Sequence, residues 1–260
     1  MRQLASWALA IAIVSTATHA QERKVVPSPL RSGSSDMSAD LRALQADDFA
    51  NPGMLWVEKG ARLWSLRAGS AGKSCADCHG DARVSMRGVA ARYPAWDARA
   101  ARLLDLEGRI NHCRVERQGA APLAFESEDL LGLTALVATQ SRGMPIQVAV
   151  DGLAAPHFGR GRALYQRRIG QMNLACVHCH VDNAGARLLA ETISQGHPTA
   201  WPGYRLQWQS AGSLQRRLRA CYFGVRAEPP PYNAPDLLDL SLFLAWRAQG
   251  LAIESPGVRR

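Results

Sequence analysis

Cys75-Ala-Asp-Cys78-His79 and Cys176-Val-His-Cys179-His180 are two copies of one five-residue pattern in this chain of 260 residues. In a Cys-x-x-Cys-His pattern, each cysteine can bond to a haem vinyl group, and the adjacent histidine is placed to ligate the iron. The pattern therefore predicts two covalently attached haems c, and a protein that moves electrons. A zinc site is disfavoured, because a histidine directly after the cysteine pair has poor spacing for zinc.

The N-terminus predicts export. Met1-Arg2 gives a positive start, an apolar run follows at residues 7–14, and Thr18-His19-Ala20 resembles a small-residue cleavage site. We expect residues 1–20 to be a signal peptide, because the apolar run is too short to cross a bilayer. No later segment approaches a membrane span. Since covalent haem attachment takes place outside the bacterial cytoplasm, we expect a periplasmic protein.

The composition fits a folded protein that recognises anions. Hydrophobic residues make up 47% of the chain, and its length leaves room for two domains. The formal net charge is +9, and nearly all of the positive charge is arginine, since only Lys24, Lys59 and Lys73 are lysines. Arginine favours bidentate contacts to oxyanions. We therefore expect an acidic protein partner or a small anionic substrate, and no nucleic acid, because no aromatic-basic module is visible.

An internal repeat organises the chain. A Gly-x-x-Leu-aromatic element begins fifteen residues before each haem motif, at residues 60–64 and 161–165. Further matched blocks follow in the same order, which predicts a tandem duplication. We align these blocks as Tyr93-Pro94 with His197-Pro198, Arg109-x-x-x-Cys113 with Arg217-x-x-x-Cys221, and residues 129–133 with residues 236–240.

The repeat predicts an all-α fold of two tandem cytochrome c-like domains, each with one covalent haem. Leucines at helical spacing predict closing helices over residues 126–139 and 234–249, with Gly143 and Gly250 as stops. No run of alternating residues suggests a strand. The expected divisions are a polar N-terminal extension at 21–50 that packs on the surface, domain 1 at 51–150, domain 2 at 151–260, and a linker around 144–156.

Several residues compete for the second axial position of each iron. Met144, followed by proline, fits the usual methionine ligand of a small cytochrome c, but Leu251 stands at the aligned position of the second half. What the halves do share is one extra cysteine each, Cys113 and Cys221. A thiolate ligand would stabilise ferric iron and lower its reduction potential. We therefore predict that His79 and Cys113 hold one iron, and that His180 and Cys221 hold the other.

Two alternatives stay open for these positions. His197 is a rival ligand in the second half, although its aligned counterpart is Tyr93. Cys113 and Cys221 could instead form a disulfide, which is natural in an oxidising compartment, if the two domains met at these positions. The remaining histidines are expected at the surface or beside haem propionates: His112, His157 and His178.

Arginines gather around Cys221, with no acidic residue at positions 214–227. On a helix, Arg217 would stand one turn before the sulfur, on the same face. Guanidinium groups favour the thiolate form and can hold an anionic substrate beside it. A solvated basic face is the alternative interpretation. The arginines concerned are Arg216, Arg217, Arg219 and Arg226.

The paired haem motifs, the Arg217-x-x-x-Cys221 element and the matching Cys113 together resemble the SoxA family, whose members are subunits of the SoxAX cytochromes of bacterial thiosulfate oxidation. The resemblance covers nearly the whole chain after residue 20. It implies a heterodimer with SoxX, a mono-haem cytochrome c. It also implies L-cysteine S-thiosulfotransferase activity, in which thiosulfate is joined oxidatively to a cysteine of the carrier protein SoxYZ and two electrons are released.

The resemblance also implies roles for individual residues, with catalysis in domain 2. Cys221 would be a haem ligand that also becomes a cysteine persulfide, Arg217 would bind substrate, and Arg247 would make a second anion contact. Cys113 is expected to act electronically or structurally. The competing interpretations are a non-catalytic periplasmic dihaem electron-transfer cytochrome and a dihaem peroxidase. The residues expected to attach haem are Cys75, Cys78, Cys176 and Cys179.

Overall fold

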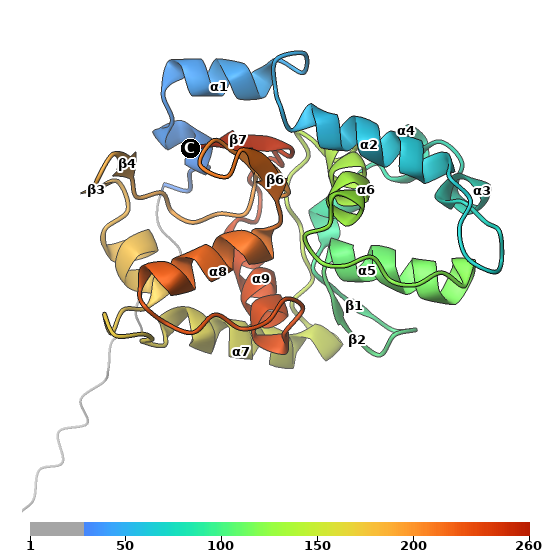
Figure 1. The fold of residues 1–260 in the computed structure, drawn as a ribbon. Helices are drawn as coiled ribbons and strands as arrows, with labels where there is room; N and C mark the ends of the chain where they lie inside the picture. Colours follow the sequence, from blue (N-terminus) through green and yellow to red (C-terminus); the bar gives the residue numbers. More distant parts are fainter. Residues whose placement is uncertain (1–28) are drawn as a thin grey trace, which may run out of the picture.

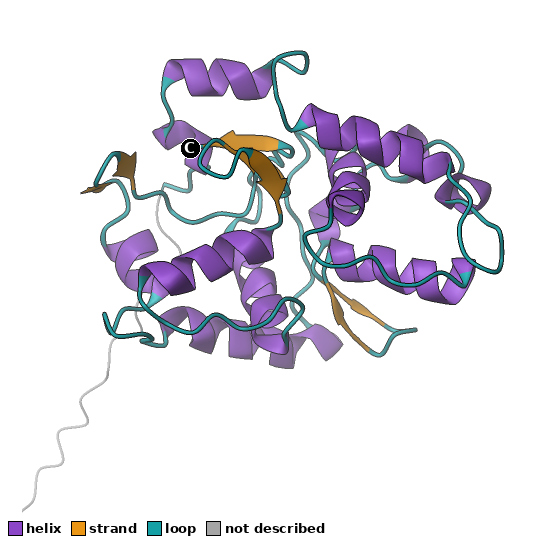
Figure 2. Cartoon of the chain, viewed as in Figure 1, coloured by secondary structure: helices purple, strands orange, loops and turns teal. Residues whose placement is uncertain are grey.

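The structure is a computed structural model that describes residues 29–260, so the predicted signal peptide at 1–20 lies outside the described residues. Its helices form two groups that follow each other along the chain (Figures 1 and 2). The first group contains α2 (Met54–Ser65), α3 (Cys75–His79), α4 (Ala82–Ser85), α5 (Leu106–Cys113) and α6 (Glu128–Thr139). The second contains α7 (Ala155–Gln166), α8 (Leu214–Gly224) and α9 (Pro235–Arg247).

The fold is not the all-α fold that the sequence predicts, because it also contains short β-strands. Seven of them lie within residues 29–260, and each is two or three residues long. Strands this short leave no visible alternation in the sequence, which is why they were not predicted. They form a β1–β2 hairpin (Ala95–Asp97, Arg102–Leu104), a β3–β4 hairpin (Arg187–Leu188, Glu191–Thr192), and a sheet of order β6-β5-β7 (Ser210–Gly212, Gly203–Arg205, Gly257–Arg259).

Each helix group is built on one close helix crossing. A Cβ placed on Gly60 of α2 would lie 2.1 Å from the carbonyl oxygen of Gly132 on α6. A Cβ on Gly161 of α7 would likewise lie 2.1 Å from the carbonyl oxygen of Asp239 on α9. Only glycine permits such close backbone contact. The glycine of each Gly-x-x-Leu-aromatic element therefore sets the helix crossing that precedes a haem motif.

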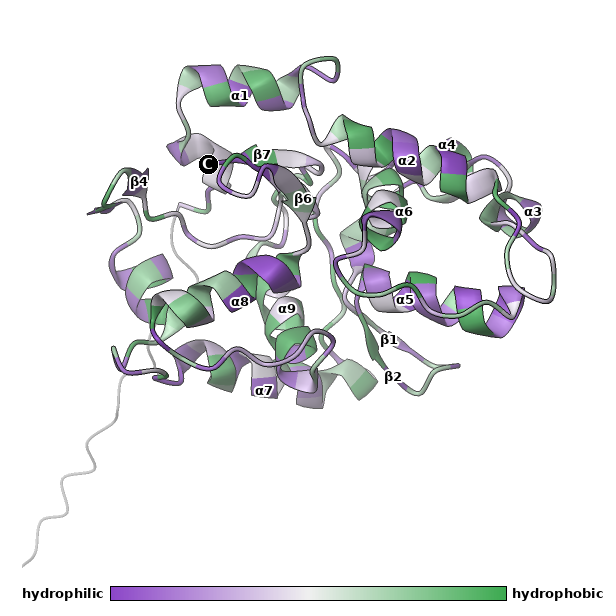
Figure 3. Ribbon diagram, viewed as in Figure 1, coloured by the Kyte–Doolittle hydropathy of each residue, from purple (hydrophilic) through white to green (hydrophobic). Residues whose placement is uncertain are grey.

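Apolar packing fills both groups and the space between them. One core cluster lies around α2 and α6, and another around α7 and α9. A third cluster joins the groups, because it combines Leu103 and Ile146 with Leu238 and Leu242 of α9. The helices at the surface carry polar and apolar residues along their length, as α2, α5 and α8 show (Figure 3). No helix within residues 29–260 is long and apolar enough to cross a membrane.

The predicted linker pairs with the C-terminal part of the chain. Gly143 N donates to the carbonyl oxygen of Ile253 at 2.9 Å, and Ile146 N donates to that of Leu251 at 2.9 Å. Both predicted helix stops have positive φ, 79° at Gly143 and 86° at Gly250, but they lie a few residues beyond the ends of α6 and α9. The segment that connects the two groups is therefore anchored by backbone hydrogen bonds.

The N-terminal segment packs on the second group. Its helix α1 (Ala39–Ala46) lies beside β7 (Figure 1). Ser32 Oγ and Ser34 Oγ each donate to Glu254 Oε1 at 2.6 Å, and Val258 N donates to Gln45 Oε1 at 3.0 Å. The described part of the predicted extension is therefore tied to the C-terminal strand.

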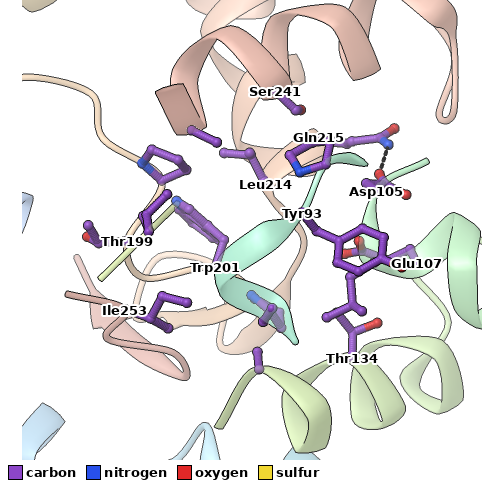
Figure 4. A pocket seen from close by; sticks show the side chains of 18 residues that line it. Tyr93, Asp105, Glu107, Thr134, Thr199, Trp201, Leu214, Gln215, Ser241 and Ile253 are labelled. Carbon is purple, nitrogen blue, oxygen red and sulfur yellow. Dashed lines mark hydrogen bonds between the residues drawn. The ribbon is translucent and has the colours of Figure 1, made fainter. Parts of the chain in front are cut away.

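A cavity of about 90 Å³ lies between the two groups and is lined by residues of both (Figure 4). At its edge, Gln215 Nε2 of α8 donates to Asp105 Oδ2 at 2.6 Å. Asp105 also caps α5, because its Oδ1 accepts from Gly108 N at 2.8 Å. Burial raises the pKa of both Asp105 and Glu107, and the Asp105 charge raises the pKa of Glu107 further. This boundary therefore favours a protonated Glu107.

A carboxyl group with a raised pKa in the folded protein makes stability depend on pH. The contribution of Glu107 to the free energy of unfolding is fully present below its ordinary pKa of 4.5. It is lost as pH rises through the higher pKa of the folded protein. We predict that Glu107→Gln raises the free energy of unfolding at about pH 8 by on the order of 1–2 kcal/mol and flattens its pH dependence. Urea unfolding at several pH values measures this, with Glu58→Gln on the exposed side of α2 as the control. Parallel curves for wild type and Glu107→Gln would contradict it.

Candidate active site

The first haem motif forms a short capped helix. Ser74 and Asp77 make a capping box, in which Asp77 N donates to Ser74 Oγ at 3.1 Å and Ser74 N donates to Asp77 Oδ2 at 2.8 Å. Helical spacing brings Cys75, Cys78 and His79 toward one side of α3. Trp64 of α2 supports this helix, because its ring lies 5.8 Å from the His79 ring and its Nε1 donates to the Gly80 carbonyl. The helix crossing and the motif are thus coupled.

In the second motif, the histidine that follows the cysteines is oriented by a loop. His180 Nδ1 lies 2.8 Å from the carbonyl oxygen of Ser194, so Nδ1–H donates and Nε2 is left for a metal. Gly196, with φ of 72°, packs on the same ring: a Cβ there would lie 2.8 Å from His180 Cγ. His178 is differently engaged, because its Nδ1 accepts from Ala175 N at 2.9 Å. The loop at residues 194–196 therefore fixes one imidazole only.

Cys221 is in contact with Arg217, the arginine one turn earlier on the same helix face, as the sequence predicts. Arg217 Nη1 donates to Cys221 Sγ at 3.1 Å from one turn earlier on α8. Burial raises the pKa of the Cys221 thiol, but the charge of Arg217, a hydrogen bond from His180 and the charge of Arg205 lower it, to about 7 in total. The His180 imidazole and the Cys221 sulfur therefore lie next to each other. A large fraction of the thiol is ionised near neutral pH.

Cys113 lies in a different electrostatic setting. It lines a cavity of about 290 Å³ together with Arg109 and His112. Arg109 stands one turn before Cys113 on α5, as Arg217 does before Cys221, but its Nη1 contacts Asp97 Oδ2 at 2.6 Å. The positive charge is therefore compensated by a carboxylate. Burial, followed by the charge of Cys113, raises the pKa of Cys75, which indicates that Cys113 is near the first motif.

The structure bears on the alternatives for the axial positions. All six cysteines lie within the described residues and none is in a disulfide, so Cys113 and Cys221 are not bonded to each other. The Nε2 atom of His197 is 3.1 Å from Gln195 Oε1. Burial and the charges of Arg247 and His180 lower the pKa of His197 to about 3. His197 is therefore a neutral side chain engaged with its own loop.

The alignment of Tyr93-Pro94 with His197-Pro198 is wrong. Strands β1 and β5 each begin a hairpin that leads into the helix with the Arg-x-x-x-Cys element. Tyr93-Pro94 therefore corresponds to Trp201-Pro202, at the spacing of 108 that also relates Cys113 to Cys221. The second half has extra residues between its haem motif and this hairpin, where β3 and β4 lie. In the corrected register, Asp97 corresponds to Arg205.

Arg247 lies inside the protein. It is 1% exposed, its guanidinium stacks on Tyr165 at 4.5 Å, and its Nη1 donates to the carbonyl oxygen of Gln195 at 3.1 Å. These contacts place it beneath the loop that orients His180. A role in anion binding stays a prediction for Arg247, whereas its contacts support a part in positioning that loop.

Gln195 connects the same loop to the N-terminal segment. Its side chain is buried: Nε2 donates to the Pro29 carbonyl at 2.8 Å, and Oε1 accepts from Arg31 N at 2.8 Å. The N-terminal segment therefore holds the loop whose Ser194 carbonyl orients His180. Sequence reasoning missed Ser194, Gln195 and Gly196, because no local pattern marks a loop that acts through contacts 166 residues away.

The residues around both motifs fit covalent haem c. Each site offers a pair of thiols, an adjacent imidazole and a further sulfur from the following helix. At the second motif the fit is seen directly, since His180 Nδ1 is satisfied by Ser194 and its ring approaches the sulfur of Cys221. Such a donor set could attach haem c and offer its iron a thiolate as second axial ligand.

Comparisons with known proteins agree with this class. Residues 59–146 match the family model described as SoxA/TsdA, cytochrome c domain. Two relatives are described as L-cysteine S-thiosulfotransferase subunit SoxA. The protein from Pseudaminobacter salicylatoxidans is 44% identical over 85% of this chain and 78% of its own length. The protein from Rhodovulum sulfidophilum is 37% identical over 88% of this chain and 80% of its own length.

A solved structure is also similar over most of the chain. The crystal structure of SoxXA from P. pantotrophus has a TM-score of 0.85 and 35% sequence identity, and the match covers 89% of this chain and 87% of that one. With the two sequence relatives, this similarity shows that the chain belongs to the SoxA family.

The contacts of Gln195 predict a local effect at the second haem motif. In Gln195→Ala, both hydrogen bonds to residues 29–31 are lost, so the Ser194 carbonyl orients His180 less well. We expect the free energy of unfolding to fall by about 1–3 kcal/mol and, if a haem is held at the second motif, its low-spin ferric signal to broaden in electron paramagnetic resonance.

A matched control is Gln118→Ala, because Gln118 is also buried and donates to the carbonyl oxygen of Lys73, next to the first motif. It should leave the signal of a haem held at the second motif unchanged. If the signal of a haem held at the second motif were the same in Gln195→Ala as in wild type, the loop would not need this support.

Proposed function

We propose that this chain is the catalytic subunit of an L-cysteine S-thiosulfotransferase, which joins thiosulfate oxidatively to a cysteine of a SoxYZ-like carrier protein. The observation that carries the proposal is the contact of Arg217 with the sulfur of Cys221, 3.1 Å apart, next to the ring of His180. The printed function of the relatives supports it. A thiolate held by a cation can accept a second anion beside it.

The proposal includes two covalent haems in two cytochrome c-like domains, at residues 51–150 and 151–260. One haem would be attached to Cys75 and Cys78, with His79 and Cys113 as axial ligands. The matched helix crossings, hairpins and Arg-x-x-x-Cys helices of the two halves support an internal duplication. The other haem would have attachment residues Cys176 and Cys179 and axial ligands His180 and Cys221.

The reaction balances with two one-electron acceptors. A carrier thiolate and thiosulfate form one sulfur–sulfur bond and give up two electrons; a carrier thiol also gives up one proton. Haem c, when bound, supplies one-electron acceptance. Arg217 is placed to balance the charge of anions that gather at Cys221, and burial strengthens this electrostatic effect. The resemblance implies that Cys221 carries an additional sulfur as a persulfide.

The proposed partners follow from the same family. A SoxX-like mono-haem cytochrome c would form the heterodimer, since the similar crystal structure is that of a SoxXA complex. A SoxYZ-like carrier and thiosulfate would be the substrates, and the periplasm would be the compartment, as the N-terminal pattern of residues 1–20 suggests. A non-catalytic dihaem carrier is less well supported, because it has no use for the contact between Arg217 and Cys221.

Arg217→Ala tests the proposal. Loss of the cation should lower thiosulfate-dependent turnover by about 100-fold or more, because it removes charge stabilisation at the reacting sulfur, while haem content stays that of wild type. The matched control is Arg109→Ala, the same change one turn before Cys113, which should keep turnover within about threefold.

Equal losses of turnover and haem content in Arg217→Ala would mean that the arginine is structural. Intact-mass measurement adds an independent readout. A sulfur-sized adduct that disappears in Cys221→Ser supports sulfur transfer, and a non-catalytic electron carrier predicts no such adduct.

A further inference from the structure

We propose that Arg205 is a second oxyanion-binding residue beside Cys221, which acts with Arg217 to hold the substrate anion. The inference rests on the proposed function and names a contact outside the Arg-x-x-x-Cys element. It follows from a charge reversal at one position of the hairpin that both halves share.

The two sites share their backbone framework. In the first, β1 pairs with β2 so that Asp97 lies opposite Arg102, and α5 follows. In the second, β5 pairs with β6 so that Arg205 lies opposite Ser210, and α8 follows. Both residues are the last of their strand, and each strand precedes a helix with an arginine one turn before a cysteine. The framework therefore places Asp97 and Arg205 at equivalent positions.

In the first site, the carboxylate of Asp97 at this position neutralises the charge of Arg109. Asp97 Oδ2 accepts from Arg109 Nη1 at 2.6 Å, and both side chains are partly buried, 15% and 29% exposed. The backbone N–H groups of Arg99 and Ala100 also donate to Asp97 Oδ1 at 3.0 and 2.9 Å, so the carboxylate is fixed. An anion that approached Arg109 would meet this carboxylate.

In the second site the same position adds a cation. Arg217 Nη1 donates to Cys221 Sγ at 3.1 Å, and Arg205 shares the Trp208 ring with Arg216, the neighbour of Arg217 on α8, at 4.9 and 4.3 Å. Burial and the charge of Arg217 lower the pKa of Arg205, whereas Glu191 raises it. Glu191 is also 3.7 Å from Arg260 Nε, so its charge is shared with another cation. Two guanidinium groups near one sulfur favour an anion between them.

Arg205 is held in place by contacts that leave its terminal nitrogens available. Its Nε donates to the carbonyl oxygen of Arg260 at 2.7 Å, and its Cζ lies 4.9 Å from the centre of the Trp208 ring. Arg216 contacts the same ring at 4.3 Å. No hydrogen bond or ion pair within residues 29–260 engages the Nη atoms of Arg205. The guanidinium is thus fixed through Nε and its face, with its Nη groups free for an oxyanion.

Thiosulfate suits this pair of cations. It carries two negative charges and presents three sulfonate oxygens at one end, and guanidinium groups bind such oxygens in a fork geometry. With Arg217 already in contact with the sulfur of Cys221, Arg205 supplies the second positive charge that a doubly charged anion needs. We therefore expect Arg205 to contribute to substrate binding more than to the chemical step.

Steady-state kinetics of the haem-loaded complex with thiosulfate tests the proposal. Arg205→Gln should raise the KM for thiosulfate about tenfold with kcat within about threefold of wild type, because a charge-assisted contact made before the reaction is lost. Arg205→Asp, which restores the charge of the first site, should raise KM further. Arg205→Lys should recover part of the loss. The control is Arg62→Gln, which removes the same charge from an exposed position on α2.

Calorimetric titration of the ferric protein with thiosulfate separates this inference from the proposed function. If the wild type binds thiosulfate more tightly than Arg205→Gln but shows no turnover, the proposed function fails and Arg205 remains an anion contact. If the wild type turns over and Arg205→Gln has the KM and affinity of Arg62→Gln, the inference alone is overturned. An altered ferric resonance spectrum in Arg205→Gln, with unchanged affinity, would also overturn it, since the residue would then be structural.

Discussion

The contact between Arg217 and the sulfur of Cys221 is the interaction on which the chemistry proposed for the second half of the molecule depends. Burial favours the neutral form of a thiol, yet here the neighbouring cation and the His180 ring bring the pKa of the partly buried Cys221 to about 7. The surroundings maintain this arrangement. The loop at 194–196 orients His180, Gln195 ties that loop to the N-terminal segment, and α8 sets the 3.1 Å contact.

The two halves use one framework for two electrostatic outcomes. Each has a glycine-mediated helix crossing, a haem motif, a hairpin and a helix with an arginine one turn before a cysteine. The residue at the end of the first hairpin strand differs: Asp97 compensates Arg109, whereas Arg205 adds to the charge of Arg217. A single position thus leaves the first arginine compensated by a carboxylate and adds a second cation in the other half.

Local patterns in the sequence predict the features that depend on residues close together in the chain. The spacing of Arg217 and Cys221 predicted their contact, and the predicted closing helices differ from α6 and α9 by a few residues at their ends. Features set by distant contacts were missed. Strands of two or three residues leave no periodicity, so Tyr93 was paired with His197 and the correspondence of Asp97 with Arg205 was hidden. The burial of Arg247 against Tyr165 likewise depends on packing between helices.

Electron paramagnetic resonance of the ferric, haem-loaded protein and its Cys221→Ser variant shows whether the sulfur of Cys221 binds iron, with Cys113→Ser as the matched change in the first half. If the sulfur of Cys221 binds iron, a low-spin signal with the narrow spread of g values typical of thiolate ligation belongs to the second haem. That signal is lost in Cys221→Ser and kept in Cys113→Ser. If that signal survived in Cys221→Ser, the sulfur of Cys221 would not be the ligand.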